Sequence, residues 1–455
     1  MRKNKPLNPT NVPVDRDKRD VWIQILTYLI LSVLVFWFLQ KFCRYDYTYD
    51  EQFRMFRYSW NYAEPLLFSA GGISTYIADY LTQFYYWPVC GALINTLFFL
   101  GTALGNFFIL RKLIPDYLTS FFAVLCGLVI VVLETDLNYQ TENTLSILLI
   151  ILALNFILYA PNKAISSVVF IVSTVVVGYI TGHFLYVFIL GLVAFLFHAL
   201  GMEKFTRKFL DKITPQNFVL RQVISVILCI CALWLGLNFF TERHHNQSTR
   251  LKCLETLRWR KDWDGILALP YMKLSPTTLY AAYQNLALAN KGVLGEQFEK
   301  YPQLGVEGLW SDNHGIQYEL LLFSDIYFVQ GNVAASQMMA FNGFYYSGKT
   351  VLPTALLRLV ETNLINGSYK VAEKYISLLE ETLLYKKPAS EYRKFLNHPE
   401  LIEQDPVLGP LKKLTQGLDG LSSDMVTDLK KIVQANPDFK AAKDYLDCYT
   451  KLSHE

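Results

Sequence analysis

Ionisable side chains cluster in the segments that join the long apolar stretches in the first half of this chain. The candidate site residues among them are Asp50, Glu51, Arg54, Arg57, Glu134, Glu142 and His183. A carboxylate at the edge of a lipid bilayer is costly unless it faces a water-filled cavity or a partner. Acids that converge from separate segments would therefore suit a shallow binding or catalytic site at the level of the membrane surface.

The same acids have a second interpretation. Every membrane-spanning stretch must end in something polar, so an isolated acid can simply mark the place where a stretch stops. In the first joining segment Asp46, Asp50 and Glu51 come within a few residues of one another. This density favours a site in that segment, whereas both interpretations stay open for the acids elsewhere.

The apolar residues come in blocks of about twenty, the length that a helix needs to cross roughly 30 Å of hydrocarbon. Hydrophobic residues make up 52% of the 455 residues, and aromatic residues, which favour membrane interfaces, reach 15%. These blocks predict an all-α fold that begins with a polytopic transmembrane helix bundle of about seven spans. The expected spans cover residues 21–39, 89–110, 117–134, 144–160, 164–182, 184–201 and 220–240.

The distribution of Lys and Arg predicts how the bundle is oriented. With the N-terminus inside, most of the Lys and Arg residues near the spans lie on the inner side, as the positive-inside rule requires. The first span is longer than the core of a signal peptide and no small-residue cleavage site follows it, so we expect an uncleaved anchor. An odd number of spans places the second half of the chain outside, and we expect a multi-pass protein of the inner (plasma) membrane.

This topology predicts how the chain is divided. Residues 1–20 are expected to be a disordered cytoplasmic tail, residues 21–241 the transmembrane domain and residues 242–455 an extracytoplasmic, or periplasmic, domain. The long first outer loop, at residues 40–88, carries aromatic residues at a partly helical spacing. We expect interfacial amphipathic helices in that loop, separated at the pair Gly71-Gly72.

The second half of the chain alternates amphipathic stretches with short breaks. One unit runs from Leu356 to Leu384 with a break at Asn366-Gly367, and another covers residues 316–346 with a break at 330–332. A third stretch with a similar pattern follows a break at residues 435–437. These stretches resemble tetratricopeptide-type repeats, whose unit is near 34 residues. The resemblance implies a soluble α-solenoid that binds other proteins or docks on the chain's own membrane domain.

The first half of the chain has its parts in the order of a known enzyme architecture. An N-inside first helix, the motif Tyr49-Asp50-Glu51, a long outer loop and the segment Gln83–Pro88 precede the remaining spans. This order resembles the GT-C glycosyltransferases over about residues 20–240, and most of all the bacterial members that use polyprenyl-phosphate-linked sugars.

The resemblance to GT-C enzymes implies roles for the candidate residues. Asp50 or Glu51 would be the catalytic residue, acting as the general base, or as the ligand of a divalent metal, that activates an acceptor hydroxyl. Arg54 or Arg57 would hold the donor phosphate, a role that suits a fork-shaped cation. The remaining residues that could line the same cavity are Glu134, Glu142 and His183.

Several other kinds of site are disfavoured. A net charge of only +3 gives no basic excess for a nucleic-acid partner. The segment Gly343–Thr350 fits the phosphate-loop pattern, but its flanks are typical of repeat helices, and such a loop needs a preceding strand. We therefore predict no ATP site. The cysteines show no metal-binding or disulfide spacing, and we assign no metal ligands.

Two functions of different classes stay open. The first is a membrane glycosyltransferase of GT-C-like architecture that acts on the outer face of the membrane. The alternative is a non-enzymatic scaffold that anchors an outward repeat domain and recruits envelope proteins. An enzyme needs Asp50 or Glu51 to point into a cavity, whereas a scaffold lets both face open water. The chain also resembles uncharacterised multi-pass bacterial membrane proteins with repeat tails, which bears on architecture and not on chemistry.

Overall fold

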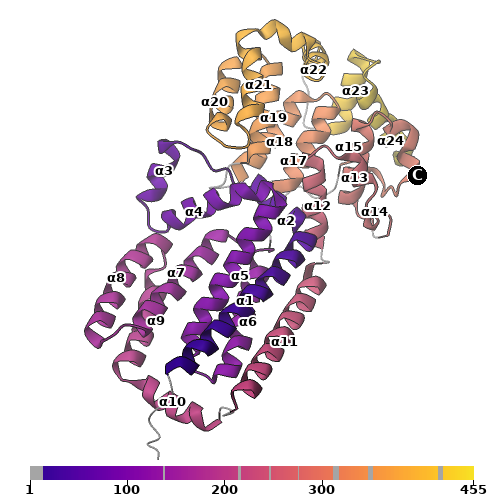
Figure 1. The fold of residues 1–455 in the computed structure, drawn as a ribbon. Helices are drawn as coiled ribbons and strands as arrows, with labels where there is room; N and C mark the ends of the chain where they lie inside the picture. The colour runs from indigo at the N-terminus through magenta and orange to yellow at the C-terminus, as the bar shows by residue number, and fades with distance from the viewer. Residues whose placement is uncertain are drawn as a thin grey trace, which may run out of the picture. The chain divides into compact units, whose positions relative to one another are not determined.

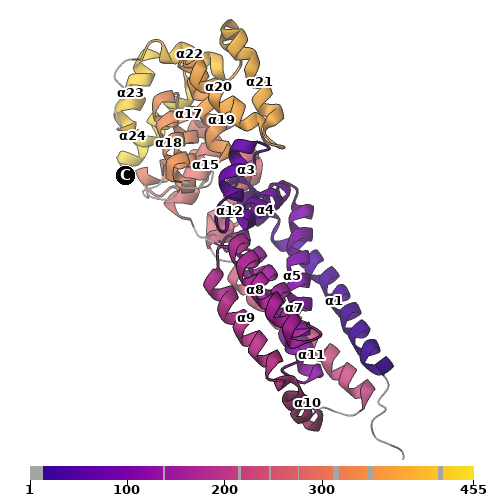
Figure 2. The same ribbon diagram turned by 90° about the vertical axis from the view of Figure 1, so that its left-hand side faces the viewer.

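The computed structural model of this chain describes residues 14–136, 139–213, 217–244, 247–274, 276–310, 317–346, 352–418 and 424–454. The regular secondary structure of these residues is helical throughout, which confirms the predicted all-α class. The chain divides into two compact units, and each combines two stretches of sequence (Figures 1 and 2). The first unit comprises Met1–Tyr47 and Glu64–Ser248, and the second comprises Thr48–Ala63 and Thr249–Glu455.

The first unit is a bundle of long helices. Its elements are α1 (Val14–Phe42), α4 (Gly72–Thr82), η1 (Gln83–Tyr86), α5 (Pro88–Leu110), α6 (Asp116–Leu133), α7 (Thr141–Leu158), α8 (Lys163–Thr181), α9 (Phe184–Ala199), α10 (Met202–Ile213) and α11 (Phe218–His244). In both views the long helices run side by side and α10 lies across one end of the bundle. Helix α1 begins at Val14, inside the predicted tail, and residues 1–13 of that tail lie outside the described residues.

Among the described residues, five helices of the first unit are long and apolar enough to cross a membrane. Their apolar segments are Val21–Phe42, Pro88–Leu110, Thr141–Leu158, Lys163–Thr181 and Val219–Thr241. The other two predicted spans coincide with α6 and α9, whose apolar segments, Tyr117–Leu133 and Phe184–Ala199, are shorter. Five apolar helices are compatible with a membrane protein, and the count of about seven spans stays a prediction.

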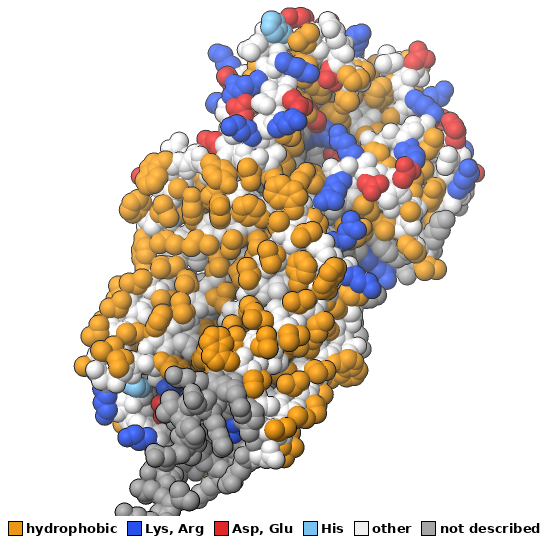
Figure 3. Space-filling model, in the orientation of Figure 1, with side chains coloured by type: hydrophobic (Ala, Val, Ile, Leu, Met, Phe, Trp, Pro, Cys, Tyr) orange, Lys and Arg blue, Asp and Glu red, His pale blue; other side chains and the backbone are white. Residues whose placement is uncertain are grey.

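Large hydrophobic side chains cover much of the outer surface of the first unit. Val168, Ile171 and Val175 of α8 are exposed, and so are Leu185 and Phe188 of α9. Figure 3 shows hydrophobic side chains spread over this face of the first unit. A water-soluble protein rarely exposes so continuous an apolar surface. These side chains therefore suit contact with lipid.

Glycines allow the helices of the first unit to approach closely. Helix α5 packs against α6, and α6 packs against α11. A Cβ added at Gly127 of α6 would lie 2.7 Å from the ring of Phe99 and 2.9 Å from its carbonyl oxygen. A Cβ added at Gly236 of α11 would lie 2.5 Å from the end of Leu128. Small residues at helix crossings are the usual means of close packing between transmembrane helices.

Gly127→Val is expected to lower the free energy of unfolding of the first unit by about 1–3 kcal/mol. The added side chain would collide with the ring and the backbone of Phe99, and the backbone cannot move aside without shifting α5. Thermal unfolding of the full chain in detergent, followed by circular dichroism, measures the effect. Gly101→Ala is the matched control, because its methyl group would meet only the end of Leu148, at 3.2 Å. An unchanged unfolding temperature in Gly127→Val would contradict the close crossing.

The second unit is a set of shorter helices. Its elements are α12 (Gln247–Trp259), α13 (Trp263–Leu267), α14 (Tyr271–Leu274), α15 (Thr278–Asn290), α16 (Leu294–Gln297), η2 (Phe298–Lys300), η3 (Val306–Leu309), α17 (Gln317–Val329), α18 (Val333–Tyr346), α19 (Pro353–Ile365), α20 (Tyr369–Glu380), α21 (Lys386–Asn397), η4 (Pro399–Gln404), α22 (Leu408–Thr415), α23 (Met425–Ala435) and α24 (Lys440–Ser453). From α17 to α21 each helix packs against the next one along the chain, and α23 packs against α24.

The helix breaks of the second unit coincide with the predicted ones. Helices α17 and α18 are separated where Gly331 has a φ of 86°, and α19 and α20 are separated where Gly367 has a φ of 73°. Backbone in this left-handed region favours glycine, which has no Cβ to clash with the following carbonyl. The positions of these helix pairs therefore follow from the sequence, whereas the solenoid arrangement stays a prediction.

Part of the first joining loop belongs to the second unit. This loop forms α2 (Arg44–Gln52), α3 (Trp60–Leu67) and α4, and the last two are separated at Gly71-Gly72, where the sequence predicted a break. Met55, between α2 and α3, is buried in the core of the second unit. Phe53 packs in the same unit against the cluster of Leu321, Leu352 and Ala355. Apolar residues for which we expected an interfacial position are thus used in the packing of the second unit.

Candidate functional site

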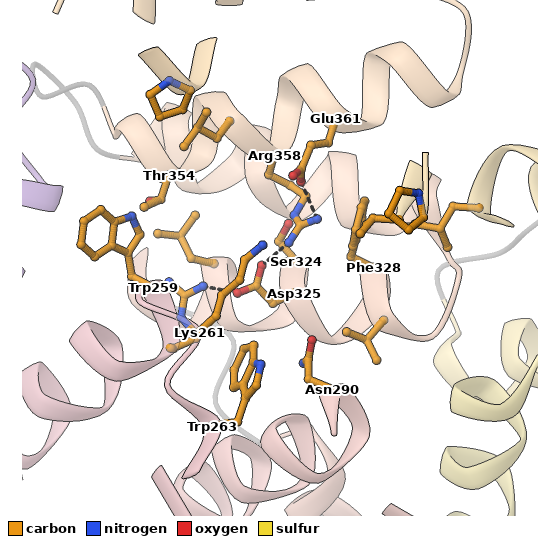
Figure 4. A pocket seen from close by; sticks show the side chains of 18 of the residues that line it. Trp259, Lys261, Trp263, Asn290, Ser324, Asp325, Phe328, Thr354, Arg358 and Glu361 are labelled. Carbon is orange, nitrogen blue, oxygen red and sulfur yellow. Dashed lines mark hydrogen bonds and ion pairs between the residues drawn. The ribbon is translucent and has the colours of Figure 1, made fainter. Parts of the chain in front are cut away.

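The second unit contains a pocket of about 550 Å³ (Figure 4). This volume falls in the range of small-ligand sites, roughly 300–1,000 Å³. Residues of α12, α13, α15, α17, α19, α21 and α22, of the segments between them and of the start of α24 line it: Arg258, Trp259, Lys261, Trp263, Asn290, Leu321, Ser324, Asp325, Phe328, Val329, Thr354, Leu357, Arg358, Glu361, Pro388, Tyr392, Pro406, Val407, Pro410, Leu411 and Phe439.

A network of ion pairs forms the polar centre of the pocket. Asp325 of α17 accepts a hydrogen bond on each carboxylate oxygen, one from Arg258 of α12 and one, at 2.7 Å, from Arg358 of α19. Arg258 also donates to both oxygens of Glu255, at 2.9 and 2.8 Å. Arg358 donates to Glu361 at 2.7 Å. The network therefore joins α12, α17 and α19 through their charged groups.

The network is largely shielded from water. The side chains of Arg258 and Glu255 are 4% and 0% exposed. Burial alone would raise the pKa of Asp325, but the two neighbouring guanidiniums lower it below its usual value. Burial alone would lower the pKa of Arg258, but Glu255 and Asp325 raise it well above its usual value. Asp325 and Arg258 therefore stay ionised at neutral pH and hold each other in place.

Aromatic side chains form the walls of the pocket. Figure 4 shows Trp259, Trp263 and Phe328 on different sides of the ionic centre. The guanidinium of Arg358 lies 3.6 Å from the centre of the Phe328 ring, which is a cation–π contact. Tyr392 donates its hydroxyl to Glu361 at 2.8 Å. The pocket thus combines flat apolar surfaces with fixed charges, as small-molecule sites commonly do.

Lys261 is held at the pocket by the turn that follows α12. Its φ is 55°, and its backbone N–H donates to the carbonyl of Arg258 at 2.9 Å. In Figure 4 its side chain extends towards Asp325 and Arg358. Within the described part of the chain, no carboxylate forms an ion pair with its ammonium group. Lys261 is therefore a cation of the pocket whose charge the protein leaves available.

The two predicted catalytic acids, Asp50 and Glu51, lie in α2. Asp50 forms an ion pair with the buried Lys252, at 3.7 Å. Glu51 is 1% exposed, and the hydroxyl of Tyr385 lies 3.0 Å from each of its carboxylate oxygens. Neither acid lines the 550 Å³ pocket. The structure therefore places these residues in contacts that hold the second unit together.

The protonation state of Glu51 follows from its burial. Burial raises the pKa of Glu51 to about 8, although the hydrogen bond from Tyr385 and the charge of Arg260 oppose the shift. The carboxyl group is therefore largely protonated at neutral pH. A protonated acid cannot accept the proton of an acceptor hydroxyl, so this environment does not suit a general base.

The two predicted phosphate-binding residues, Arg54 and Arg57, lie in the segment that follows α2. Arg57 forms an ion pair with Glu381 at 3.5 Å, and the carbonyl oxygen of Glu381 accepts a hydrogen bond from the backbone of Tyr58 at 2.7 Å. The backbone N–H of Arg54 donates to the carbonyl of Glu51 at 3.1 Å. Neither arginine lines the pocket. Arg57 thus ties this segment to the end of α20.

The other three predicted site residues lie in the first unit. Glu134 is 7% exposed and accepts hydrogen bonds from the hydroxyls of Thr141, at 3.1 Å, and Thr144 at the start of α7. Glu142 lies in the first turn of α7. His183 precedes α9, with its ring 5.9 Å from that of Tyr186. The seven predicted site residues are therefore divided between the two units, and neither unit contains all of them.

The structure bears on a metal site and on the phosphate-loop pattern only within the described residues. In them, the structure forms no group of three or more His, Cys, Asp or Glu side chains that could hold a metal ion. Of the phosphate-loop pattern, Gly343–Tyr346 belong to α18, and residues 347–350 lie outside the described residues.

Sequence reasoning did not single out the pocket residues. Arg258, Asp325 and Arg358 are far apart along the chain and form no motif. One usable signal was present, because Asp325 and Arg358 are charged residues inside apolar helical stretches, where a charge needs a partner. A second signal was the placement of Lys261 between Trp259 and Trp263.

Comparisons with known proteins identify the family and no function. The model of the Family of unknown function (DUF6057) matches residues 21–455, so this chain belongs to that family. No curated protein and no solved structure gives a significant match. The resemblances to GT-C enzymes and to tetratricopeptide repeats therefore stay expectations.

Proposed function

We propose that this member of the DUF6057 family is a membrane-anchored binding protein without enzymatic activity. The apolar helices of the first unit hold the chain in a bilayer, and the second unit binds a partner molecule in its pocket. The observation that carries the proposal is the 550 Å³ pocket, in which charged side chains of three helices meet between aromatic walls. The acids that a sugar transferase would need are engaged in other contacts.

The proposed anchor is a bundle of about seven spans with the N-terminus inside. Five long apolar helices and the two shorter apolar helices α6 and α9 support this count. The positive-inside rule supports the orientation, and an odd number of spans places the second unit on the outer side of an inner membrane. Burial of the exposed apolar surface of the first unit in lipid would provide the anchoring free energy.

The proposed partner-binding part is the succession of helices from α17 to α21. Each helix packs against the next, as in a helical-repeat solenoid of tetratricopeptide type. Solenoids use extended surfaces to bind other molecules, and an envelope protein recruited by this unit would fit a scaffold role. The pocket residues Arg258, Asp325 and Arg358 would then give the scaffold one chemically defined contact point.

A membrane glycosyltransferase that uses a polyprenyl-phosphate-linked sugar is the second candidate function. One observation favours it: the pKa of Glu51 is raised to about 8, and strongly shifted pKa values cluster at functional sites. Structural burial of a carboxyl group also produces such a shift. The hydrogen bond from Tyr385 and the 1% exposure of Glu51 support the structural explanation.

Sugar transfer by the purified full chain in lipid tests the two functions against each other. We expect no transfer from a panel of polyprenyl-phosphate-linked donors, with or without a divalent metal. The same assay on Asp50→Asn and Glu51→Gln controls for background activity, because neither substitution is expected to unfold the protein. Transfer by the wild type that disappears in a folded variant would establish the enzyme and end the present proposal.

Native mass spectrometry of the full chain, extracted from its own membranes in mild detergent, tests binding directly. We expect a bound species on the wild type and a reduced occupancy on Trp263→Ala, which removes one wall of the pocket. Trp310→Ala is the matched control, because Trp310 stacks on Tyr449 and does not line the pocket. Equal occupancy in both variants would show that the pocket is not the binding site.

A further inference from the structure

We infer that the pocket of the second unit takes a small molecule that carries a carboxylate or phosphate group on an apolar, ring-bearing body. The inference rests on the proposed binding function and names the class of ligand. It follows from the hydrogen-bonding capacity, the charge and the wall chemistry of the pocket.

The carboxylates of the pocket are already engaged. Both oxygens of Asp325 accept hydrogen bonds from guanidinium groups, those of Arg258 and Arg358. One oxygen of Glu361 accepts from Arg358 and the other from Tyr392, at 2.7 and 2.8 Å. Each oxygen keeps a second lone pair, but a positively charged ligand group would have to approach these carboxylates beside the guanidiniums that already bind them.

Hydrogen-bond donors of the cationic side chains are also left unused. A guanidinium has five N–H donors, and Arg358 makes two hydrogen bonds, to Asp325 and Glu361. The ammonium of Lys261 has three N–H donors and no hydrogen bond among the described residues. Lys261 is exposed at the pocket and extends towards Arg358 (Figure 4). The complementary ligand group is an acceptor with two or more oxygens.

The charge of the lining supports an anion over a neutral acceptor. Three cations line the pocket, Arg258, Lys261 and Arg358, against two carboxylates, Asp325 and Glu361. Arg258 also pairs with Glu255, which does not line the pocket, so three carboxylates engage the two guanidiniums. Lys261 is the cation of the lining that has no ion pair among the described residues. A carboxylate or phosphate would pair with Lys261 through charge-assisted hydrogen bonds, which are about twice as strong as neutral ones.

The aromatic and aliphatic lining of the pocket indicates that the ligand has an apolar part beside its anionic group. Trp259 and Trp263 flank Lys261 in the sequence and face the ionic centre from different sides (Figure 4). Leu321 and Leu357 add aliphatic surface to the lining. Indole rings offer flat apolar faces that stack on other rings. The 550 Å³ volume leaves room for such a body beside the anionic group, whereas a bare inorganic anion would leave these walls without a partner.

Binding of simple anionic probes tests the inference. The full chain in nanodiscs of neutral phosphatidylcholine is titrated with phenyl phosphate, benzoate and benzyl alcohol by isothermal calorimetry. We expect both anions to bind more tightly than the alcohol. Lys261→Gln should weaken the anions about fivefold and leave the alcohol unchanged. Lys370→Gln is the matched control, because Lys370 is an exposed lysine of α20 that does not line the pocket. Hydrogen exchange should show protection of α12, α17 and α19 by the anions.

Further titrations identify whether the anionic group is a phosphate or a carboxylate, and whether the ligand is a lipid or a soluble molecule. A tighter fit of phenyl phosphate than of benzoate would point to a phosphate ligand, and the reverse to a carboxylate. Nanodiscs that contain phosphatidylglycerol would compete with the probes if a lipid headgroup occupies the pocket, and would leave probe binding unchanged if the ligand is a soluble molecule. Inorganic phosphate that binds as tightly as phenyl phosphate would contradict the apolar body.

Two outcomes would overturn the inference in different ways. Benzyl alcohol that binds as tightly as the anions, with no effect of Lys261→Gln, would exclude an anionic ligand and leave the proposed binding function intact. Absence of saturable binding for every probe at millimolar concentration would also overturn the ligand class. The proposed binding function would then be decided by native mass spectrometry, that is, by whether a bound species is found on the wild type and is reduced on Trp263→Ala.

Discussion

Glu51→Gln is expected to stabilise the second unit at pH 8 and to change its stability little at pH 5. The pKa of Glu51 in the folded protein is raised to about 8 by burial, whereas the pKa of an unfolded glutamate is about 4.5. Glutamine has nearly the same shape and can still accept the hydrogen bond that Tyr385 donates. The substitution therefore removes a group that must carry its proton in the folded state.

The sign of the pH dependence follows from this raised pKa. Between pH 4.5 and pH 8 the folded state holds a proton on Glu51 that the unfolded state has released, so stability falls as the pH rises. The contribution of Glu51 is fully present below the unfolded pKa and is lost as the pH rises through the folded one. A shift of this size corresponds to about 5 kcal/mol in the wild type, and Glu51→Gln abolishes it.

Hydrogen exchange of the full chain in nanodiscs at pH 5 and pH 8, corrected for the intrinsic rate, measures this effect in the peptides that contain Glu51 and Tyr385. Glu391→Gln is the matched control, because Glu391 is an exposed acid of α21. Equal protection of wild type and Glu51→Gln at pH 8 would show that Glu51 is not buried as a protonated acid. Loss of protection in Glu51→Gln at both pH values would mean that the ionised carboxylate is the stabilising form.

Arg258→Leu is expected to lower the free energy of unfolding of the second unit by about 3–5 kcal/mol. The substitution leaves Glu255, which is 0% exposed, without its guanidinium partner, and Asp325 keeps only Arg358. An uncompensated buried carboxylate is costly because it has lost its hydration. The hydroxyl of Tyr283, which donates to Glu255, supplies one hydrogen bond and no neutralising charge.

Urea unfolding of the full chain in detergent, followed by limited proteolysis of the second unit, measures the loss in Arg258→Leu. Arg393→Gln is the control, because Arg393 is 40% exposed and its pair with Glu380 lies at the surface. Exposed ion pairs contribute about 0–1 kcal/mol. If Arg258→Leu were no more destabilised than Arg393→Gln, the ion-pair network would not be a buried structural element.

Glu51 and the ion-pair network stabilise different parts of the second unit. Glu51 and Tyr385 fasten the segment from the first joining loop to the rest of the second unit. Arg258, Asp325 and Arg358 join α12, α17 and α19 at the centre of the pocket. Because the network is buried and fixed in position, the pocket needs little ordering when it binds a ligand, and such preorganisation lowers the entropic cost of binding.

The sequence by itself determined the helical class and the positions of most helices. Apolar blocks of about twenty residues locate the long helices of the first unit, since the length of a spanning helix is set by the thickness of the bilayer. Gly331 and Gly367 locate the breaks between the helices of the second unit, since only glycine adopts their backbone conformation at low cost. These signals are local, so a single sequence is enough to read them.

Only the tertiary structure decided where the acids and arginines go. Glu51 and Tyr385 are 334 positions apart, and Arg258 and Asp325 are 67 apart. No local pattern links residues at such separations. A single long-range contact leaves no repeating pattern in the sequence, and any charged residue of the chain could have been the partner of Glu51 or Arg258. The sequence therefore located a density of acids around Asp50 and Glu51 but did not distinguish a catalytic carboxylate from a buried structural one. The difference lies in desolvation, which depends on what the folded chain packs around each group.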